Sequence, residues 1–214
     1  DRFGPVILGT REKVIYGSGY IEDVLCGKRF RISSSSFYQI NPVQTEKLYS
    51  AAIGLAGLTG NETVLDAYCG IGTIGLSASD KAKQVIGVEI NRDAVNDAIA
   101  NARLNGVKNC WFTVGDAGKY MEQMAADKVK PDIVFMDPPR AGSDERFLSS
   151  LLKCAPKRIV YISCNIDTQR RDLDVLLSGG YKLRRIQPVD MFPYTEHVET
   201  VVLLSHKKPD SYIH

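Results

Sequence analysis

A chain of 214 residues with 44% apolar side chains is long enough for one α/β core, or for one core with a small appendage. Its formal net charge of +2 at pH 7 permits a nucleic-acid partner but does not require one. Apolar runs fall short of the ~18 residues of a membrane span and no signal-peptide pattern is present, so we expect no membrane partner and no secretion.

The cysteines indicate a reducing, cytoplasmic compartment. They are odd in number, widely spaced and without a C-x-x-C pair: Cys26, Cys69, Cys110, Cys154 and Cys164. The three histidines lie near the C-terminus, so the spacing of a zinc site is absent and we expect no metal in this chain. We expect the chain to act as a monomer. Because it begins at Asp1 and not at methionine, we interpret it as a fragment of a longer protein.

The first 40 residues are rich in short β-like stretches. Those stretches, separated by glycines, are Glu12–Tyr16, Tyr20–Leu25 and Arg29–Ser33. The polar run Ser33–Ser36 then leads to Asn41-Pro42, which predicts a helix start, and apolar spacing continues this helix to about Gly57. We interpret residues 1–36 as the remnant of a β-rich central domain with its linker, and residues 37–214 as the catalytic domain.

From Glu62 onward, strand-like and helix-like segments alternate. The predicted strands are Thr63–Ala67, Gln84–Glu89, Trp111–Val114, Asp132–Met136 and Arg158–Ser163, and the clearest helices are Arg92–Asn105 and Glu145–Lys153. This alternation predicts an α/β fold of the doubly wound, Rossmann-like class, with a mainly parallel sheet and helices on both faces. Only a polar loop joins Tyr181–Gln187 to Glu199–Ser205, so we expect these two to form an antiparallel pair at one edge.

A glycine-rich turn follows the first strand of this series. Gly70, Gly72 and Gly75 spell G-x-G-x-x-G, and Glu89 ends the next predicted strand 19 residues after Gly70. This pattern matches the fingerprint of a dinucleotide site. Ordinary tight turns also use glycine at such positions, so the pattern alone does not identify a ligand.

Acidic residues near the turn favour S-adenosylmethionine over a nicotinamide dinucleotide. Asp66 ends the strand before the glycines, where a carboxylate can meet the ammonium group of the ligand but would repel a pyrophosphate. Glu89 suits the ribose hydroxyls of either ligand. Asp116 follows a further strand and can accept a hydrogen bond from an adenine amino group. Residues just past successive strands line the crevice where doubly wound sheets bind ligands.

Three further motifs follow predicted strands or precede the last one. They are Asp137-Pro138-Pro139-Arg140, Ser163-Cys164-Asn165 and the segment Asp190–Thr200 with its Glu199. Each has an ordinary structural explanation: prolines can end a strand, a free cysteine is often a small buried residue, and a glutamate is usually a surface charge. Their joint placement at strand ends, beside the glycine turn, favours a shared site.

The chain resembles the bacterial RNA uracil-5-methyltransferase family in five segments that occur in the family's order. These are Phe37-Tyr38-Gln39-Ile40-Asn41, Asp66-Ala67-Tyr68-Cys69-Gly70-Ile71-Gly72, Asp137-Pro138-Pro139-Arg140, Ser163-Cys164-Asn165 and His197-Val198-Glu199-Thr200. The match runs from about Phe37 to about Ser205. The tyrosine at position 68 makes the glycine turn more similar to that of the 23S ribosomal-RNA enzymes of Gram-positive bacteria. The resemblance implies a class I methyltransferase fold, S-adenosylmethionine as the cofactor, and RNA as the partner, with ribosomal RNA favoured over transfer RNA.

The resemblance also implies roles for the matching residues. Cys164 would be the nucleophile and Glu199 the general base, with Asp137 and Arg140 close to them. Residues of the glycine turn and the strand ends would contact the cofactor: Gln39, Asp66, Tyr68, Gly70, Gly72, Thr73, Glu89, Asp116 and Asp137. Gln39 and Phe37 would contact the target base. Family members commonly have proline after the Ser-Cys-Asn sequence, whereas this chain has Ile166.

The chemistry implied by the resemblance needs these side-chain types. Carbon 5 of uracil is a poor nucleophile, but a thiolate that adds at carbon 6 turns the ring into an enolate that can take a methyl group from a sulfonium. A base must then remove the carbon 5 proton so that the thiolate can leave. Arg140 near Cys164 would favour the thiolate form. The target base must also leave its stack to reach such a site.

Several alternatives remain open from the sequence. A dehydrogenase using NAD would explain the literal G-x-G-x-x-G but not Cys164 or Glu199. A methyltransferase for exocyclic amines commonly has an aromatic residue after Asp/Asn-Pro-Pro, where this chain has Arg140. An inactive RNA-binding module, or a transfer-RNA uridine methyltransferase of the same family, would also fit the pattern.

Overall fold

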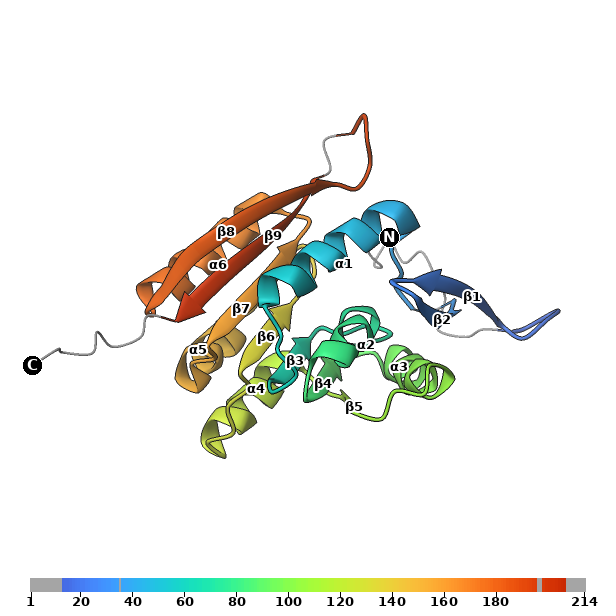
Figure 1. Cartoon of the computed structure of the whole chain (residues 1–214), viewed down its shortest axis with the longest axis horizontal. Coiled ribbons are helices and arrows are strands. Elements are labelled where there is room, and N and C mark those ends of the chain that lie inside the picture. The colour runs from blue at the N-terminus through green and yellow to red at the C-terminus, as the bar shows by residue number, and fades with distance from the viewer. Residues whose placement is uncertain (1–12, 35, 196–197, 207–214) are drawn as a thin grey trace, which may run out of the picture.

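The computed structural model describes residues 13–34, 36–195 and 198–206. In this part of the chain, a seven-stranded sheet is flanked by helices, and a two-stranded hairpin lies beside it (Figure 1). The strands of the large sheet are β3 (Thr63–Ala67), β4 (Gln84–Glu89), β5 (Cys110–Val114), β6 (Ile133–Met136), β7 (Arg158–Ser163), β8 (Tyr181–Asp190) and β9 (Val198–His206).

The order of these strands is β5-β4-β3-β6-β7-β9-β8. Strands β3 to β7 pair in parallel, whereas β9 is antiparallel to both of its neighbours, β7 and β8. Strand order therefore reverses next to β3, which is the point where a doubly wound sheet opens a crevice for ligands. The predicted fold class is confirmed, including the antiparallel pair at the C-terminal edge.

Helices cover both faces of the sheet, as the sequence predicted. They are α1 (Pro42–Ala56), α2 (Thr73–Ala78), α3 (Arg92–Leu104), α4 (Ala117–Ala126), α5 (Glu145–Cys154) and α6 (Ile166–Ser178), with a short 3-10 turn at Ser79–Lys81. Adjacent strand residues such as Val64 and Leu65 point into separate apolar cores. One core contains side chains of α1, α2 and α3, and the other contains side chains of α4, α5 and α6.

Side-chain caps fix where several helices begin. Asn41 Oδ1 accepts from the Gln44 amide with Pro42 at the start of α1, and Gly57 ends the helix with a φ of 59°, so the predicted helix is confirmed. Asp116 and Asn165 cap α4 and α6 directly after β5 and β7. Because each cap follows a strand, the amino ends of these helices meet at the carboxyl edge of the sheet.

The structure corrects several predicted boundaries. Residues 13–16 do not form a strand, because their exposed side chains have no neighbouring strand among the described residues; Glu12 lies outside those residues. Strand β6 begins at Ile133, one residue later than predicted, and the Asp132 carboxylate before it accepts from the Thr63 amide (2.9 Å) and from Lys157 Nζ (2.8 Å). Strand β5 begins one residue earlier than predicted, and β8 continues three residues further, to Asp190.

No helix in the described residues has both the length and the apolar character that crossing a membrane requires. Even α1, the longest of them, has only 15 residues, fewer than the ~20 that span a bilayer.

One strand of the hairpin is bound along its edge by side chains of α3. The hairpin consists of β1 (Tyr20–Leu25) and β2 (Lys28–Ser33). Asn105 and Asn101 each accept from a backbone amide of β2 and donate to the carbonyl of the same residue, Arg29 and Arg31 respectively, over 2.6–3.1 Å. Four helical residues rise about 6 Å, close to the ~6.7 Å of two strand residues. The helix therefore serves as a partner for the strand edge.

This contact joins the hairpin to the glycine turn. Asp97 continues the row by accepting from the Ser33 amide (2.9 Å), and Asn101 Nδ2 also donates to the Ile71 carbonyl (3.2 Å). Leu25, Phe30 and Ile32 of the hairpin are buried in the same core as α1. The hairpin is thus packed on the large sheet's helices, while the division of the chain at residue 36 stays a prediction.

We predict that Asn101→Ala lowers the free energy of unfolding by about 2 kcal/mol, because it leaves the Arg31 amide and carbonyl without their buried partner. Asn96→Ala is the matched control, since Asn96 is an exposed residue of the same helix. Urea denaturation of both variants and the wild type measures the effect. Equal stability of the two variants would show that the row of side chains does not hold the hairpin.

Candidate functional site

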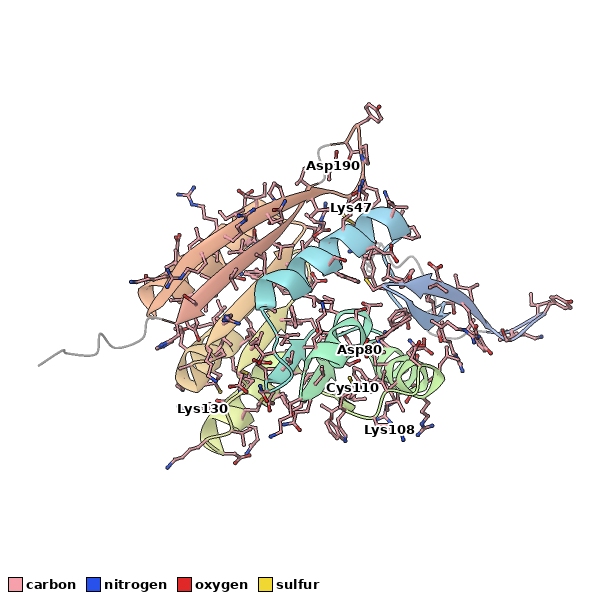
Figure 2. All side chains as sticks on the ribbon, in the orientation of Figure 1. Lys47, Asp80, Lys108, Cys110, Lys130 and Asp190 are labelled. Atoms are coloured by element: carbon pink, nitrogen blue, oxygen red, sulfur yellow. The ribbon has the colours of Figure 1, made fainter. Side chains whose placement is uncertain are left out.

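A cavity of about 880 Å³ lies at the carboxyl ends of the parallel strands. Its walls come from the turns after β3, β4, β5, β6 and β7, from the start of β9 and from residues 37–40. Figure 2 marks the two ends of the sheet: Lys108 and Lys130, which precede β5 and β6, lie at one end, and Asp190, the last residue of β8, lies at the other. A cavity of this size is in the range of small-molecule and cofactor sites.

Most of the residues that the sequence singled out line this one cavity. They are Phe37, Gln39, Tyr68, Gly70, Thr73, Glu89, Asp116, Asp137, Arg140, Cys164 and Glu199. Asp66 and Gly72 do not line it. Tyr38, Tyr49 and Phe192 are on the wall as well, although the sequence analysis assigned none of them a role.

Asp66 is buried beneath the glycine turn, and its predicted contact with a cofactor stays a prediction. Its side chain is 1% exposed, and its Oδ2 accepts from the Gly75 amide (2.8 Å). A side chain at Gly75 would meet this oxygen at 2.8 Å, so the glycine is required for packing. The carboxylate therefore holds the first turn of α2. Burial, opposed by the Gly75 hydrogen bond and reinforced by Glu89, raises the pKa of Asp66 to about 7.

Gly72 is also set by packing. Its φ is 83°, and an added side chain would lie 2.9 Å from the Phe112 ring and 3.2 Å from Ala98. Tyr68, by contrast, takes a left-handed φ of 63° although it is not glycine. Its hydroxyl donates to Ser143 Oγ (3.3 Å) and its ring packs on Phe147. These contacts fix an aromatic wall of the cavity.

The Glu89 carboxylate ties the glycine turn to the next strand. Oε2 accepts from the Gly70 amide (3.1 Å) and Oε1 accepts from the Asn91 amide (2.8 Å). Asp116 similarly accepts from the Lys119 amide through Oδ1 (2.9 Å). A carboxylate can accept about four hydrogen bonds. Both side chains therefore keep acceptor capacity for hydroxyl or amino groups of a ligand in the cavity.

The pairing of β7 with β9 brings Cys164 and Glu199 to the same place. Ser163 is opposite Thr200, so the residue that follows β7 and the residue that precedes Thr200 meet at the carboxyl edge. Gln169 of α6 fixes this register, because its Nε2 donates to the carbonyls of Tyr161 (3.3 Å) and Thr200 (3.4 Å). Thr200 Oγ1 is also hydrogen-bonded to Gln169 Oε1.

Two carboxyl groups of the cavity wall, those of Asp137 and Glu199, differ in the groups that surround them. Burial raises the pKa of Asp137 well above its ordinary value, and the charges of Glu199 and Asp66 raise it further. Burial also raises the pKa of Glu199, but the guanidinium of Arg140 opposes that effect. The two carboxyl groups thus differ in that Asp137 has acidic neighbours, whereas Glu199 has a guanidinium that favours its ionised form.

The turn that carries Cys164 is held by α6. Asn165 caps the helix, and its Nδ2 donates to the Arg140 carbonyl (3.2 Å), to which Thr168 Oγ1 also donates (3.1 Å). The nucleophile candidate and the arginine loop are therefore connected through the first turn of α6. Ile166 is the first residue of this helix, a position where proline is common, so isoleucine there is compatible with the same turn.

A buried carboxylate that the sequence reasoning missed secures the other side of the arginine loop. Asp172 is 0% exposed and accepts from the Ser143 amide and from the Tyr161 hydroxyl, both at 2.8 Å. Arg171 binds this carboxylate and donates to the carbonyls of Ala141 (3.0 Å) and Ser143 (3.1 Å). Because Ser143 also binds Tyr68, the network connects both halves of the cavity.

Comparison with known proteins identifies the family. Residues 6–207 match the family model described as tRNA (Uracil-5-)-methyltransferase, which is most of the chain. The chain belongs to this family. Membership favours the adenosyl interpretation of the glycine turn over the dinucleotide interpretation.

Relatives with curated names are considerably longer than this chain. An uncharacterized RNA methyltransferase of Halalkalibacterium halodurans is 52% identical over 202 residues, which are 94% of this chain and 44% of the relative. Another, from Staphylococcus aureus, is 52% identical over 207 residues, which are 97% of this chain and 46% of the relative. The chain thus spans less than half the length of these relatives.

A solved family structure shares the fold. Pyrococcus abyssi tRNA (uracil-54, C5)-methyltransferase, in complex with S-adenosyl-L-homocysteine, matches with a TM-score of 0.75 and 34% identity. The match covers 88% of this chain and 45% of that one. The architecture is that of the class I S-adenosylmethionine-dependent methyltransferases, as predicted.

We predict that Asp66 makes folding stability depend on pH. Because burial raises its pKa from 3.8 to about 7, the folded chain holds a proton that the unfolded chain has released. The free energy of unfolding should therefore fall as the pH rises from about 4 to about 7. Asp66→Asn cannot ionise and keeps an oxygen for the Gly75 amide, so it should remove this part of the slope. Thermal melts across the window test this, and an unchanged slope would contradict the assignment.

Proposed function

We propose that this protein transfers a methyl group from S-adenosylmethionine to carbon 5 of a uridine in RNA, through a covalent adduct with Cys164. The observation that carries the proposal is the single cavity in which Cys164, Glu199 and Arg140 lie together with Glu89 and Asp116. Family membership and the Pyrococcus abyssi structure with S-adenosyl-L-homocysteine support it.

The residues present fit an adenosyl cofactor. Glu89 keeps acceptor capacity after binding two backbone amides and suits the ribose hydroxyls, and Asp116 suits the adenine amino group. Tyr68 and Ile71 add apolar wall beside them. When bound, S-adenosylmethionine supplies an electrophilic methyl group. The rest of the wall, which includes Arg140 and Cys164, is left for the target base.

Cys164 and Glu199 then act on the base one after the other. The Cys164 thiolate adds to carbon 6, and the electron pair of the carbon 5–carbon 6 double bond moves to make an enolate at oxygen 4. Carbon 5 of this enolate takes the methyl group. Glu199 removes the carbon 5 proton, the double bond forms again, and the bond between carbon 6 and the Cys164 sulfur breaks to release the thiolate.

The raised pKa values assign the two carboxyl groups. Burial and the charges of Glu199 and Asp66 raise the pKa of Asp137 well above its ordinary value, which favours a role as hydrogen-bond donor to the developing charge on the base. Glu199 has Arg140 to stabilise its ionised form, which suits a group that must accept a proton. Arg140 and Cys164 both belong to the wall of the same cavity.

The substrate class is RNA, and within RNA we favour 23S ribosomal RNA. The sequence around Tyr68 supports the ribosomal substrate. The name of the family model and that of the Pyrococcus abyssi protein both refer to transfer RNA, whereas the relatives at 52% identity are named only as RNA methyltransferases. We propose that the protein acts in the cytoplasm as a monomer and reaches its uridine after the base has left its stack.

We predict that Cys164→Ala and Glu199→Gln fail at different steps. The alanine variant lacks the nucleophile, so it should form no covalent complex and transfer no methyl group. The glutamine variant keeps the shape of the base but cannot accept the carbon 5 proton, so it should stall after methyl transfer. A denaturation-resistant protein–RNA adduct that carries label from the methyl donor should then accumulate.

The assay uses the longest form of the protein that occurs naturally. Unmodified transcripts of 23S ribosomal RNA and of transfer RNA are tested separately, each at a saturating concentration. Cys154→Ala is a control, because Cys154 is buried in the core on the α4–α6 face and away from the cavity. Methylation of uridine by Cys164→Ala would refute the covalent mechanism. Wild-type turnover by Glu199→Gln would make Asp137 the next candidate for the base.

A further inference from the structure

The loop between β8 and β9 contains a strained turn beside the cavity. Both the amide and the Oγ1 of Thr195 donate to the Phe192 carbonyl, at 3.0 and 2.7 Å, and close a four-residue turn with Pro193 and Tyr194 at its centre. Proline fixes a negative φ at the first central position, and Tyr194 has a φ of 72° at the second. This is the type II pattern, which favours glycine at the position that Tyr194 occupies.

The strain at Tyr194 is not repaid by packing within the described residues. A residue with a side chain in the left-handed region costs about 1–2 kcal/mol relative to an ordinary conformation. The Tyr194 side chain is nevertheless completely exposed, at 107% of its reference area. Strained residues that gain nothing from their own fold are found at functional sites. The turn holds an aromatic ring in solvent, which indicates a partner outside this chain.

The turn is fixed in relation to the cavity. Phe192, its first residue, lines the cavity together with Glu199. Asn41 Nδ2 donates to the Met191 carbonyl (2.9 Å), which anchors the entry to the turn on the start of α1. The loop projects beyond the carboxyl end of the sheet, on the side where the parallel strands end (Figure 1). Tyr194 therefore lies two residues beyond Phe192, a residue of the cavity wall.

Apolar side chains of the cavity wall are exposed as well. Phe37, Ile40 and Ile90 line the cavity and are 78%, 81% and 71% exposed. Large apolar side chains that gather around a cavity mark a binding surface. Few charges are needed to recognise the flat face of a nucleobase, and aromatic rings stack on it regardless of base identity.

We propose that Tyr194 is a stacking platform for a nucleobase next to the target uridine. The inference rests on the proposed function. A uridine that enters the cavity leaves its stack, so its neighbour in the RNA loses a stacking partner. The Tyr194 ring, held by a turn whose first residue lines the cavity, replaces that partner. Tyr194 thus contributes to RNA binding and to extrusion of the uridine, without contact with the reacting atoms.

The test compares three substitutions that separate the ring from the turn. Tyr194→Gly suits a φ of 72° and should fold at least as stably as the wild type, yet it should weaken RNA binding about tenfold, the scale of one lost aromatic stack. Tyr194→Phe keeps the ring and should bind RNA within about twofold of the wild type. Tyr194→Leu keeps apolar bulk without the flat ring and should resemble the glycine variant.

Binding is measured by filter retention of the RNA transcript that the wild type methylates, in a Cys164→Ala background that prevents turnover. Thermal melts and calorimetry with S-adenosyl-L-homocysteine are recorded for each variant. The proposal would be supported if only the glycine and leucine variants lost RNA affinity, while the melting temperature and the affinity for S-adenosyl-L-homocysteine stayed unchanged in every variant. RNA affinity equal to wild type in Tyr194→Gly, or an equal loss in Tyr194→Phe, would overturn it.

A third result would also overturn it: a fall in melting temperature or in S-adenosyl-L-homocysteine affinity for Tyr194→Gly would show that Tyr194 supports the fold. Methyl transfer is measured separately with Cys164 intact. If the wild type transferred no methyl group to uridine, the proposed function would fail, and retention of unmodified 23S ribosomal RNA transcript would still show whether Tyr194 contacts RNA. The two failures are therefore distinguishable.

Discussion

The antiparallel register of β7 and β9 is the constraint on which the site depends. Five parallel strands bring their carboxyl ends to one edge of the sheet. A further strand can place its amino end at the same edge only if it runs antiparallel to them. Strand β9 does so, and the pairing of Ser163 with Thr200 places Glu199 at the level of Cys164. A slip of one residue would turn every side chain of β9 to the opposite face. Gln169, which binds both strands, opposes such a slip.

The cavity is held from behind by polar side chains that do not enter it. Asp172 and Arg171 bind the loop after Arg140, and that loop reaches Tyr68 through Ser143. On the other side, Asn101 joins the hairpin to the glycine turn. Asp172 and Asn101 are fully buried, and their hydrogen bonds give directional contacts where apolar packing alone would allow sliding. The two halves of the cavity are therefore positioned as one unit.

Much of the fold followed from patterns along the chain, because alternating strand and helix signals restrict the topology to a doubly wound sheet. The helix caps at Asn41 and Gly57 were predictable because capping depends on adjacent residues. Helices α4 and α6 were not singled out, although Asp116 and Asn165 gave cap signals at their starts. Each side chain had been interpreted only as part of a ligand site.

The site was predictable to the extent that residues at strand ends converge. Cys164, Glu199, Arg140 and Glu89 were found in this way. The spacing of residues along the chain does not show which way a side chain points. Asp66 was therefore expected to line the cavity, whereas its carboxylate binds the Gly75 amide. Tyr49 and Asp172 lie within helices, at positions that look like ordinary helix residues in sequence. Only the packing of α1 and α6 against the sheet gives them their neighbours.

The claim that carbon 5 of uridine is the methylated atom is tested most directly by the fate of its hydrogen. RNA that carries tritium at carbon 5 of its uridines is incubated with the wild-type protein and S-adenosylmethionine labelled in the methyl group. The account predicts that tritium is released to water in equal amount to the methyl group incorporated, since Glu199 removes that hydrogen for each methyl added. Methyl incorporation without tritium release would contradict it, because the group would then be on another atom.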